Sequence, residues 1–473
     1  MSSRQRMLLK KSGCASPRPR VHYIQHPFEV PERARRVTAT LCYHRAGLAQ
    51  LDLALFDPNN FRGIRMPKIN ATGEIGLNLW VGTADASPGG IPGPIPPGRW
   101  RAQIDLDHIT DPIHYSLTVT AEFDGEEKPF IFEYPEAYVS RAVPGWYKGE
   151  LHAHSWESDG ELPAHEVVSA ARQYGLNFLA LTDHNTISSW RFLKDLLSTD
   201  IALIRAEELT AHGGHANLLG IKRWVNPYVD AAGWNMTQAM HEVHAQGGLF
   251  CVNHPFSNQW GWQYHHFAWD EVDLIEIYHN MEGPNNWLSL PFWDHHLNLG
   301  RRIIGVGATD SHHPHRGKHR LGQVVTWVYA PELSESGIIQ GLKSGRVYIS
   351  RGPKIEFSAH TRDAPHRIAY MGGKLPIGKA IDFHIEVRRV QEPLLLFILK
   401  NGLYFDLKEL GEVGKDYNIE FTDTPDSPAY YRIELHAVSG NEGERELRRR
   451  SYITVRVLSN PIFVGAWSAR GGV

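Results

Sequence analysis

The sequence of 473 residues contains only three cysteines, at positions 14, 42 and 251. They form no CxxC pair and are too few for a disulfide framework, which excludes a thiolate metal site and a disulfide-stapled fold. Such scarcity is typical of a reducing compartment, so we expect a cytoplasmic protein. The sequence also lacks the run of about 20 apolar residues that a membrane span needs. Its basic, polar start has no apolar signal-peptide core, and we therefore expect no membrane association.

The chain also lacks a large excess of either positive or negative charge. The chain has 49 Lys and Arg against 52 Asp and Glu, a net charge of −3, so we expect no general binding of nucleic acid. Gly373–Lys379 matches the GxxxxGK pattern of a phosphate loop, but Ala380 follows instead of Ser or Thr. A strand pattern also follows where that loop needs a helix. No GxSxG motif for a serine nucleophile occurs.

Histidine is the residue that the chain has in excess. It has 27 histidines, and 18 of them lie between residues 144 and 352. Many belong to a series of short motifs that also contain carboxylates. The series comprises His152-Ala153-His154, Ser158-Asp159-Gly160, Thr182-Asp183-His184, Glu207, His215, Asn253-His254-Pro255 and Asp310-Ser311-His312.

Three patterns divide the chain. Residues 21–142 alternate apolar and polar side chains in short runs separated by turns, which predicts an N-terminal β-sandwich. In 143–352, short apolar runs alternate with helical stretches, which predicts a parallel sheet, open or closed. Alternation returns in 353–473 and predicts a C-terminal β-sandwich. We interpret residues 1–20 as a flexible tail. The predicted fold class is thus multidomain, α/β plus all-β.

The motifs follow the apolar runs of the central region, where α/β sheets and barrels place their active sites. His152 and His154 are two residues apart, so on a strand both imidazoles face the same side, and Asp310 and His312 repeat this spacing. Nitrogen and oxygen donors without thiolates suit Zn, Mn or Fe. Bridged metals of this kind lower the pKa of a bound water, so we predict a multinuclear metallohydrolase.

The motifs Gly149–His154, Ser158–Gly160, Leu181–Thr186, Asn253–Pro255 and Thr309–His312 resemble those of the PHP (polymerase and histidinol phosphatase) superfamily. The resemblance covers about residues 143–352. With the flanking sandwiches, the chain is more similar to the carbaryl-hydrolase-like (CehA/McbA-like) branch. This resemblance implies a central distorted (β/α)7 barrel that holds two to three divalent metal ions.

The resemblance also implies a role for each motif. His152, His154, Glu207 and Asp310 would hold one metal, and Glu207 would bridge to a second held by His215 and His254. Asp159, His184 and His312 would hold the third. His212 is an alternative to His215. Asp183 would orient a neighbouring ligand. The expected catalytic residues are Glu207, Asp310, His312 and Asp183.

Substrate-binding candidates lie beside these motifs. Arg316 and Arg320 follow the last metal motif and can grip a phosphate, although an exposed basic loop has the same composition. Asn280 ends another apolar run, together with Glu276, Tyr278 and His279. These residues are expected to line the pocket.

Three functions fit the sequence. The leading hypothesis is a phosphoesterase that uses a metal-bridging hydroxide on a small phosphate ester. The second keeps the site but cleaves an aryl carbamate or ester, which the tryptophan-rich central region favours. The third is a polymer-binding or partner-binding protein with a secondary barrel. All expected metal ligands lie between residues 152 and 312, so we expect the sandwiches to be supports. The oligomeric state stays open.

Overall fold

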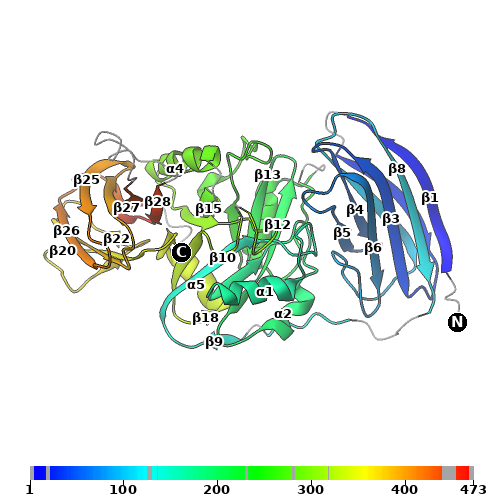
Figure 1. The fold of residues 1–473 in the computed structure, drawn as a ribbon, viewed down its shortest axis with the longest axis horizontal. Helices are drawn as coiled ribbons and strands as arrows, with labels where there is room; N and C mark the ends of the chain where they lie inside the picture. The colour runs from blue at the N-terminus through cyan, green and yellow to red at the C-terminus, as the bar shows by residue number, and fades with distance from the viewer. Residues whose placement is uncertain are drawn as a thin grey trace. The chain divides into compact units, whose positions relative to one another are not determined.

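The computed structural model describes residues 5–17, 22–124, 130–135, 137–229, 233–279, 283–317, 319–438 and 454–467. In this part of the chain strands predominate and helices are few (Figure 1). The expectation of several β-sheets beside a region of mixed helix and strand is confirmed. Among these residues, no helix is both long and apolar enough to cross a membrane.

The N-terminal region forms two four-stranded sheets. One sheet has the order β1-β8-β3-β6, and the other has the order β2-β7-β4-β5. Their bounds are β1 Gln5–Ala15, β2 Tyr23–Val30, β3 Arg36–Arg45, β4 Gln50–Phe56, β5 Phe61–Arg65, β6 Gly73–Gly82, β7 Gly98–Asp107 and β8 Ile113–Glu122.

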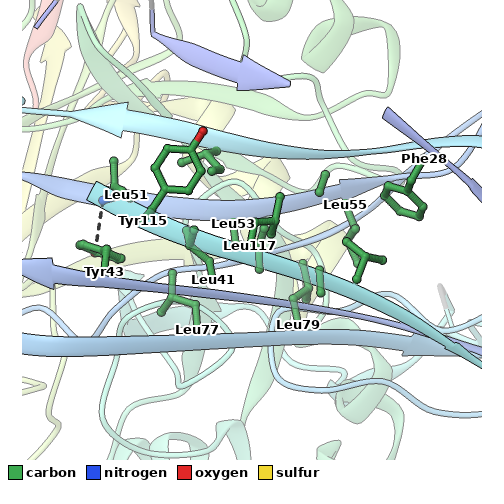
Figure 2. Packing of buried hydrophobic residues seen from close by; sticks show 14 of the residues in the cluster. Phe28, Leu41, Tyr43, Leu51, Leu53, Leu55, Leu77, Leu79, Tyr115 and Leu117 are labelled. Atoms are coloured by element: carbon green, nitrogen blue, oxygen red, sulfur yellow. Dashed lines mark hydrogen bonds between the residues drawn. The ribbon is translucent and has the colours of Figure 1, made fainter. Parts of the chain in front are cut away.

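The core of this sandwich follows from the alternation in the sequence. In β3 every second side chain is buried, as the period of two requires. Leu41 of β3 and Leu117 of β8 come from one sheet, while Leu53 of β4 comes from the other, and all three are fully buried in one cluster (Figure 2). The backbone N–H of Leu51 donates to the hydroxyl of Tyr43 at 3.2 Å in the same core.

The expectation of a flexible tail at 1–20 is wrong for Gln5–Ala15, which form β1 and pair antiparallel with β8. Strand pairing is made by the backbone, so basic side chains are tolerated on an edge strand, where they also discourage aggregation. Leu8 and Leu9 pack, partly buried, against the sandwich core.

Removal of residues 1–17 is therefore expected to destabilise the protein. It would expose the backbone edge of β8 and the apolar surface under Leu8 and Leu9. We expect the Tm of the sandwich to fall by roughly 5 °C and self-association to increase. Thermal unfolding with light scattering measures both, and removal of residues 1–4 alone is the control. An unchanged Tm and an unchanged molecular mass for the shorter chain would contradict this role of β1.

Helices and strands alternate through the first part of the central region. The elements are β9 Val139–Arg141, β10 Gly145–Ala153, α1 Ala164–Gln173, β11 Phe178–Leu181, α2 Trp190–Leu196, β12 Ala202–Ala211, β13 Gly214–Leu219, α3 Met236–Ala245, β14 Leu249–Val252, β15 Leu274–His279, α4 Gly283–Asn298, β16 Ile304–Ala308, β17 Val325–Ala330, β18 Leu333–Ser334, α5 Glu335–Ser344 and β19 Val347–Ser350. The helices predicted near residues 166, 236 and 334 correspond to α1, α3 and α5. A capping box between Asn235 and Gln238 begins α3, and Gly345 in the left-handed conformation ends α5.

The central strands lie in the order β16-β15-β14-β13-β12-β11-β10-β17-β19 within one large sheet. β14, β15 and β16 run parallel, but β13 and β17 are each antiparallel to both of their neighbours, so the predicted parallel sheet is wrong at these two strands. The described strands do not show a closed (β/α)7 barrel. An isolated parallel bridge between Ala153 and Ser311 brings the chain after β10 beside the chain after β16.

The C-terminal strands form two sheets. β20 Lys354–Thr361, β21 Ala369–Tyr370, β23 Ile381–Arg388 and β26 Tyr417–Asp423 make a separate four-stranded sheet. β28 pairs with β19 and thereby continues the central sheet into the order β28-β27-β24-β25. The bounds are β22 Lys374–Leu375, β24 Leu394–Lys400, β25 Leu403–Leu410, β27 Ala429–Ala437, β28 Val455–Ser459 and β29 Ile462–Val464.

By its internal packing the chain divides into two compact units. The first comprises Met1–Pro135, His154–Ser169 and Leu181–Leu196, so two short central segments pack with the N-terminal sandwich. The second comprises Glu136–Ala153, Ala170–Ala180 and Leu197–Val473. The boundaries of these units differ from the domain boundaries predicted at 142/143 and 352/353.

Candidate metal centre

The site begins on β10, where alternation separates two kinds of side chain. Leu151 belongs to the hydrophobic core of the central sheet, whereas Glu150 and His152, on the other side of the strand, are fully buried polar groups. Glu150 accepts hydrogen bonds from the backbone N–H of Thr309 at 3.1 Å and from its hydroxyl at 2.6 Å. Burial nevertheless raises the pKa of Glu150 to about 7. These contacts fix β10 beside the chain that carries Asp310.

Glu208, and not the expected Glu207, is the glutamate that meets the histidines. On β12, Glu208 pairs with Asn217 of β13 and Glu207 pairs with Leu218, so the two carboxylates lie on opposite faces. Glu207 is buried and accepts a hydrogen bond from the backbone N–H of Val225 at 3.1 Å. Burial raises the pKa of Glu207 well above its ordinary value.

The two oxygens of the fully buried Glu208 face different imidazoles. Oε2 lies 3.2 Å from Nε2 of His152. Oε1 lies 3.2 Å from Nδ1 of His215 and 3.6 Å from Nε2 of His254. The predicted residue His215 therefore contacts this carboxylate. A carboxylate divided in this way can bind two cations, one on each oxygen.

Glu276 orients two of the imidazoles. Its Oε1 lies 2.7 Å from Nδ1 of His152, and its Oε2 lies 3.1 Å from Nδ1 of His279 and accepts from the backbone N–H of His254. Burial would raise the pKa of Glu276, but His152 and His279 hold it far below its ordinary value. A carboxylate on Nδ1 leaves Nε2 to bind a metal, an arrangement that fixes both tautomer and ring orientation.

Charge accumulates around His152. Burial alone would lower the pKa of this imidazole, but the charges of Glu208, Asp310 and Glu276 raise it well above its ordinary value. In His279, burial likewise lowers the pKa, and Glu276 and Asp310 outweigh that effect. Three carboxylates around these buried imidazoles make a negatively charged pocket that a metal cation could neutralise.

Asp310 and His312 approach the same group from the loop after β16. Asp310 Oδ1 lies 3.3 Å from Nε2 of His152, and Oδ2 lies 3.6 Å from Nε2 of His279. His312 Nδ1 lies 3.1 Å from the carbonyl oxygen of Asp310. Asp310 and His254 have positive φ values of 51° and 23°, a conformation that is costly outside glycine and occurs more often at functional sites.

His154, Asp159 and His184 come together within the first compact unit. Their ligand atoms lie within 4.8 Å of one another. The rings of His154 and His184 stack at 4.4 Å, and Nε2 of His184 lies 3.6 Å from Oδ1 of Asp159. Three of the nine predicted ligands thus lie together, although the resemblance assigned His154 to the first metal and Asp159 and His184 to the third.

Asp183 connects the two segments that carry this group. Its fully buried carboxylate accepts from the backbone N–H of Ser155 at 2.8 Å and from the hydroxyls of Ser155 and Ser158 at about 3 Å. Burial raises the pKa of Asp183, and the Ser155 and Ser158 hydrogen bonds oppose that change. These contacts tie the segment after β11 to the loop that carries Asp159, while the predicted role of Asp183 in orienting a ligand stays a prediction.

The donors fit divalent metal ions. Metal bonds of 2.0–2.2 Å place neighbouring ligand atoms roughly 3.0–3.5 Å apart. The separations of 3.2 and 3.3 Å from His152 to Glu208 and Asp310 fall in this range, and 3.6 Å from His254 to Glu208 is close to it. In addition, Nδ1 of His254 is buried and has no hydrogen-bond partner among the described residues.

None of the three substrate-binding candidates has a contact with these ligands that the described residues show. Asn280 is outside the described residues. Arg316 and Arg320 are exposed, and the guanidinium of Arg320 lies over the ring of Tyr174, 5.8 Å from its centroid. Sequence reasoning placed Glu276 and His279 only on the pocket wall. It overlooked Glu208, which the register of β12 with β13 places on the face of His215.

Comparisons with known proteins add little. No family model and no curated protein matches this sequence. Among solved structures, the chain is similar to a two-domain protein from Bacteroides vulgatus that contains a predicted PHP-like metal-dependent phosphoesterase. The identity is 18% over 66% of this chain and 95% of that one, with a TM-score of 0.37.

Two further structures, of the CARDB domain of a Pyrococcus furiosus protein, are also similar to part of the chain. One is a solution NMR structure and the other is a crystal structure with di-metal ions. Each is 15% identical and covers 24% of this chain and 95% or 94% of the domain, with TM-scores of 0.16 and 0.14. Similarities at this level support no conclusion about this chain.

Proposed function

We propose that the chain is a divalent-metal-dependent hydrolase of the PHP superfamily that cleaves small phosphate esters. The observation that supports this most is the division of Glu208 between His152 on one oxygen and His215 and His254 on the other. A single buried carboxylate with imidazoles on both oxygens is suited to bridging two cations. A lone structural ion would not require this arrangement.

The proposal modifies the ligand set inferred from the sequence. His152, His154, Glu208 and Asp310 would hold one metal ion, and Glu208 would bridge to a second held by His215 and His254. Asp159, His184 and His312 would hold a third. Glu208 takes the bridging role first given to Glu207. A barrel closed around these ligands remains part of the proposal, as do zinc, manganese or iron as the ions and a cytoplasmic location.

The metals would neutralise phosphoryl oxygens and lower the pKa of an attacking water. The chain's own residues prepare the site for that chemistry. Glu276 holds the rings of His152 and His279 with their Nε2 atoms directed away from it. In this proposal Glu207, which accepts a hydrogen bond from the backbone N–H of Val225, takes no part in the chemistry. Asp310 is the most open of the carboxylates, with 19% of its side chain exposed, and is the residue that a substrate would reach.

We propose that the cleaved bond is a phosphate ester, because the exposed Arg316 and Arg320 follow Asp310 and His312 on one loop and suit an anionic group.

The test compares hydrolysis of p-nitrophenyl phosphate, bis-p-nitrophenyl phosphate and a naphthyl carbamate by metal-loaded protein. We expect turnover of a phosphate ester that a chelator abolishes. Turnover of the carbamate alone would favour the second hypothesis, and turnover of none by protein that binds metal would contradict a general hydrolase.

A further inference from the structure

The N-terminal sandwich grips the loop that carries Asp159. Arg65, at the end of β5, donates through Nη1 to the carbonyl oxygens of Trp156 at 2.6 Å and Ser158 at 3.3 Å. Nζ of Lys68, three residues later, donates to the carbonyl oxygen of Gly160. Two cationic side chains of the sandwich therefore fix the backbone on both sides of Asp159. Both lie with that loop in the first compact unit.

A buried ion pair fixes the same loop from a second direction. Glu157 is fully buried, accepts from the backbone N–H of Gly89 at 3.0 Å and pairs with Arg191 at 3.1 Å. Arg191 also donates to the carbonyl oxygen of Ala86 at 3.0 Å. Gly89 has a φ of +80°, and a Cβ there would lie 1.9 Å from the carbonyl oxygen of Ile64 and 2.9 Å from that of Glu157. A side chain at position 89 would therefore clash with β5 of the sandwich itself and also with the loop at Glu157.

These anchors reach the candidate ligands through short connections. Asp159 lies between the anchored residues Ser158 and Gly160. His184 lies next to Asp183, whose carboxylate accepts from Ser155 and Ser158 of the same loop. If the loop moved, Asp159 would move with it, and the contact of Asp183 with the loop would be lost. The positions of Asp159 and His184 therefore depend on residues of a domain that has no metal ligand of its own in the proposed set.

We propose that Arg65 and Lys68 are positioning residues of the metal centre, so that the N-terminal sandwich sets the affinity for one of its divalent ions. This rests on the proposed function, and it adds a specific role to the expectation that the sandwiches are supports. The affected ion is the one assigned to Asp159, His184 and His312. The ion assigned to His215 and His254 has no ligand in the gripped loop and should bind as before.

The test uses the full chain with Arg65→Gln and Lys68→Met, singly and together, and measures metal per chain and Mn²⁺ affinity. Arg65→Lys is the conservative variant, and Arg99→Gln, which removes an exposed arginine of the same sandwich, is the matched control. Circular dichroism and Tm establish that each variant is folded. We expect the double variant to lose affinity for one ion by about 10–100-fold, to retain the others and to show a lower kcat at nearly unchanged KM.

The outcomes separate the two proposals. Arg65→Lys should restore part of the affinity, and Arg99→Gln should match the wild type. Wild-type metal content and affinity in both single variants would overturn the positioning role while the proposed function stands. Uniform loss of every ion together with a lower Tm would also overturn it, because that pattern means general destabilisation. If the double variant does not fold, the single variants measure the same affinity. A wild-type chain that binds no metal would overturn the proposed function, and this inference with it.

Discussion

Substitution of Glu208 by Gln is expected to lower kcat/KM for a phosphate ester by at least about 1,000-fold, equivalent to about 4 kcal/mol of transition-state stabilisation. An amide presents one oxygen and one N–H₂ donor, so it would lose the contact with His152 or the contact with His215 and His254. Fewer than the wild-type number of metal ions should remain bound. Steady-state kinetics and metal analysis of the same preparation measure both effects.

Glu207→Gln is the matched control, one residue away on the same strand. Its carboxylate is buried and accepts from Val225, a hydrogen bond that an amide oxygen can also accept. We expect wild-type metal content and activity within about threefold, a change of about 0.6 kcal/mol. The reverse result, with Glu207→Gln inactive and Glu208→Gln active, would return the bridging role to Glu207.

Substitution of Glu276 by Gln should have the next largest effect. Glu276 contacts Nδ1 of both His152 and His279 and accepts from the backbone of His254. Loss of one such orienting carboxylate is worth roughly 10–100-fold in metal affinity or activity. Because Glu276 serves two histidines, we expect a loss of about 100-fold or more in kcat/KM.

Glu271→Gln provides the control for Glu276, since Glu271 contacts the exposed His241 at 2.9 Å. That variant should retain activity. Excess Mn²⁺ should restore part of the activity of Glu276→Gln, because weaker binding is overcome by concentration. Full activity of Glu276→Gln without added metal would show that the orientation of His152 does not depend on Glu276.

Local patterns in the sequence predicted much of the fold. Alternation revealed the strands of the N-terminal sandwich, and the helical stretches near residues 166, 236 and 334 correspond to α1, α3 and α5. Two features were missed because they depend on pairing between distant strands. β1 is stabilised by its register with β8, and β13 turns back between β12 and β14. Neither strand register can be predicted from the composition of the strand itself.

In the candidate site, too, the residues that depend on pairing between distant segments could not be predicted from the sequence. His152, His154, Asp310 and His312 could be predicted because their two-residue spacing follows apolar runs, although only His152 of the four lies within a strand. Glu207 and Glu208 are adjacent, and only the register of β12 with β13 decides which one shares a face with His215. The influence of Arg65 on Asp159 joins residues 94 positions apart and has no local signal at all.

The metal content of protein purified without any chelator tests the central claim most directly. Inductively coupled plasma mass spectrometry on such a preparation should find two to three zinc, manganese or iron ions per chain. Prolonged chelation should remove them together with phosphate-ester hydrolysis, and readdition of the metal should restore both. A preparation with no transition metal, whose hydrolytic activity persists in strong chelator, would contradict the account.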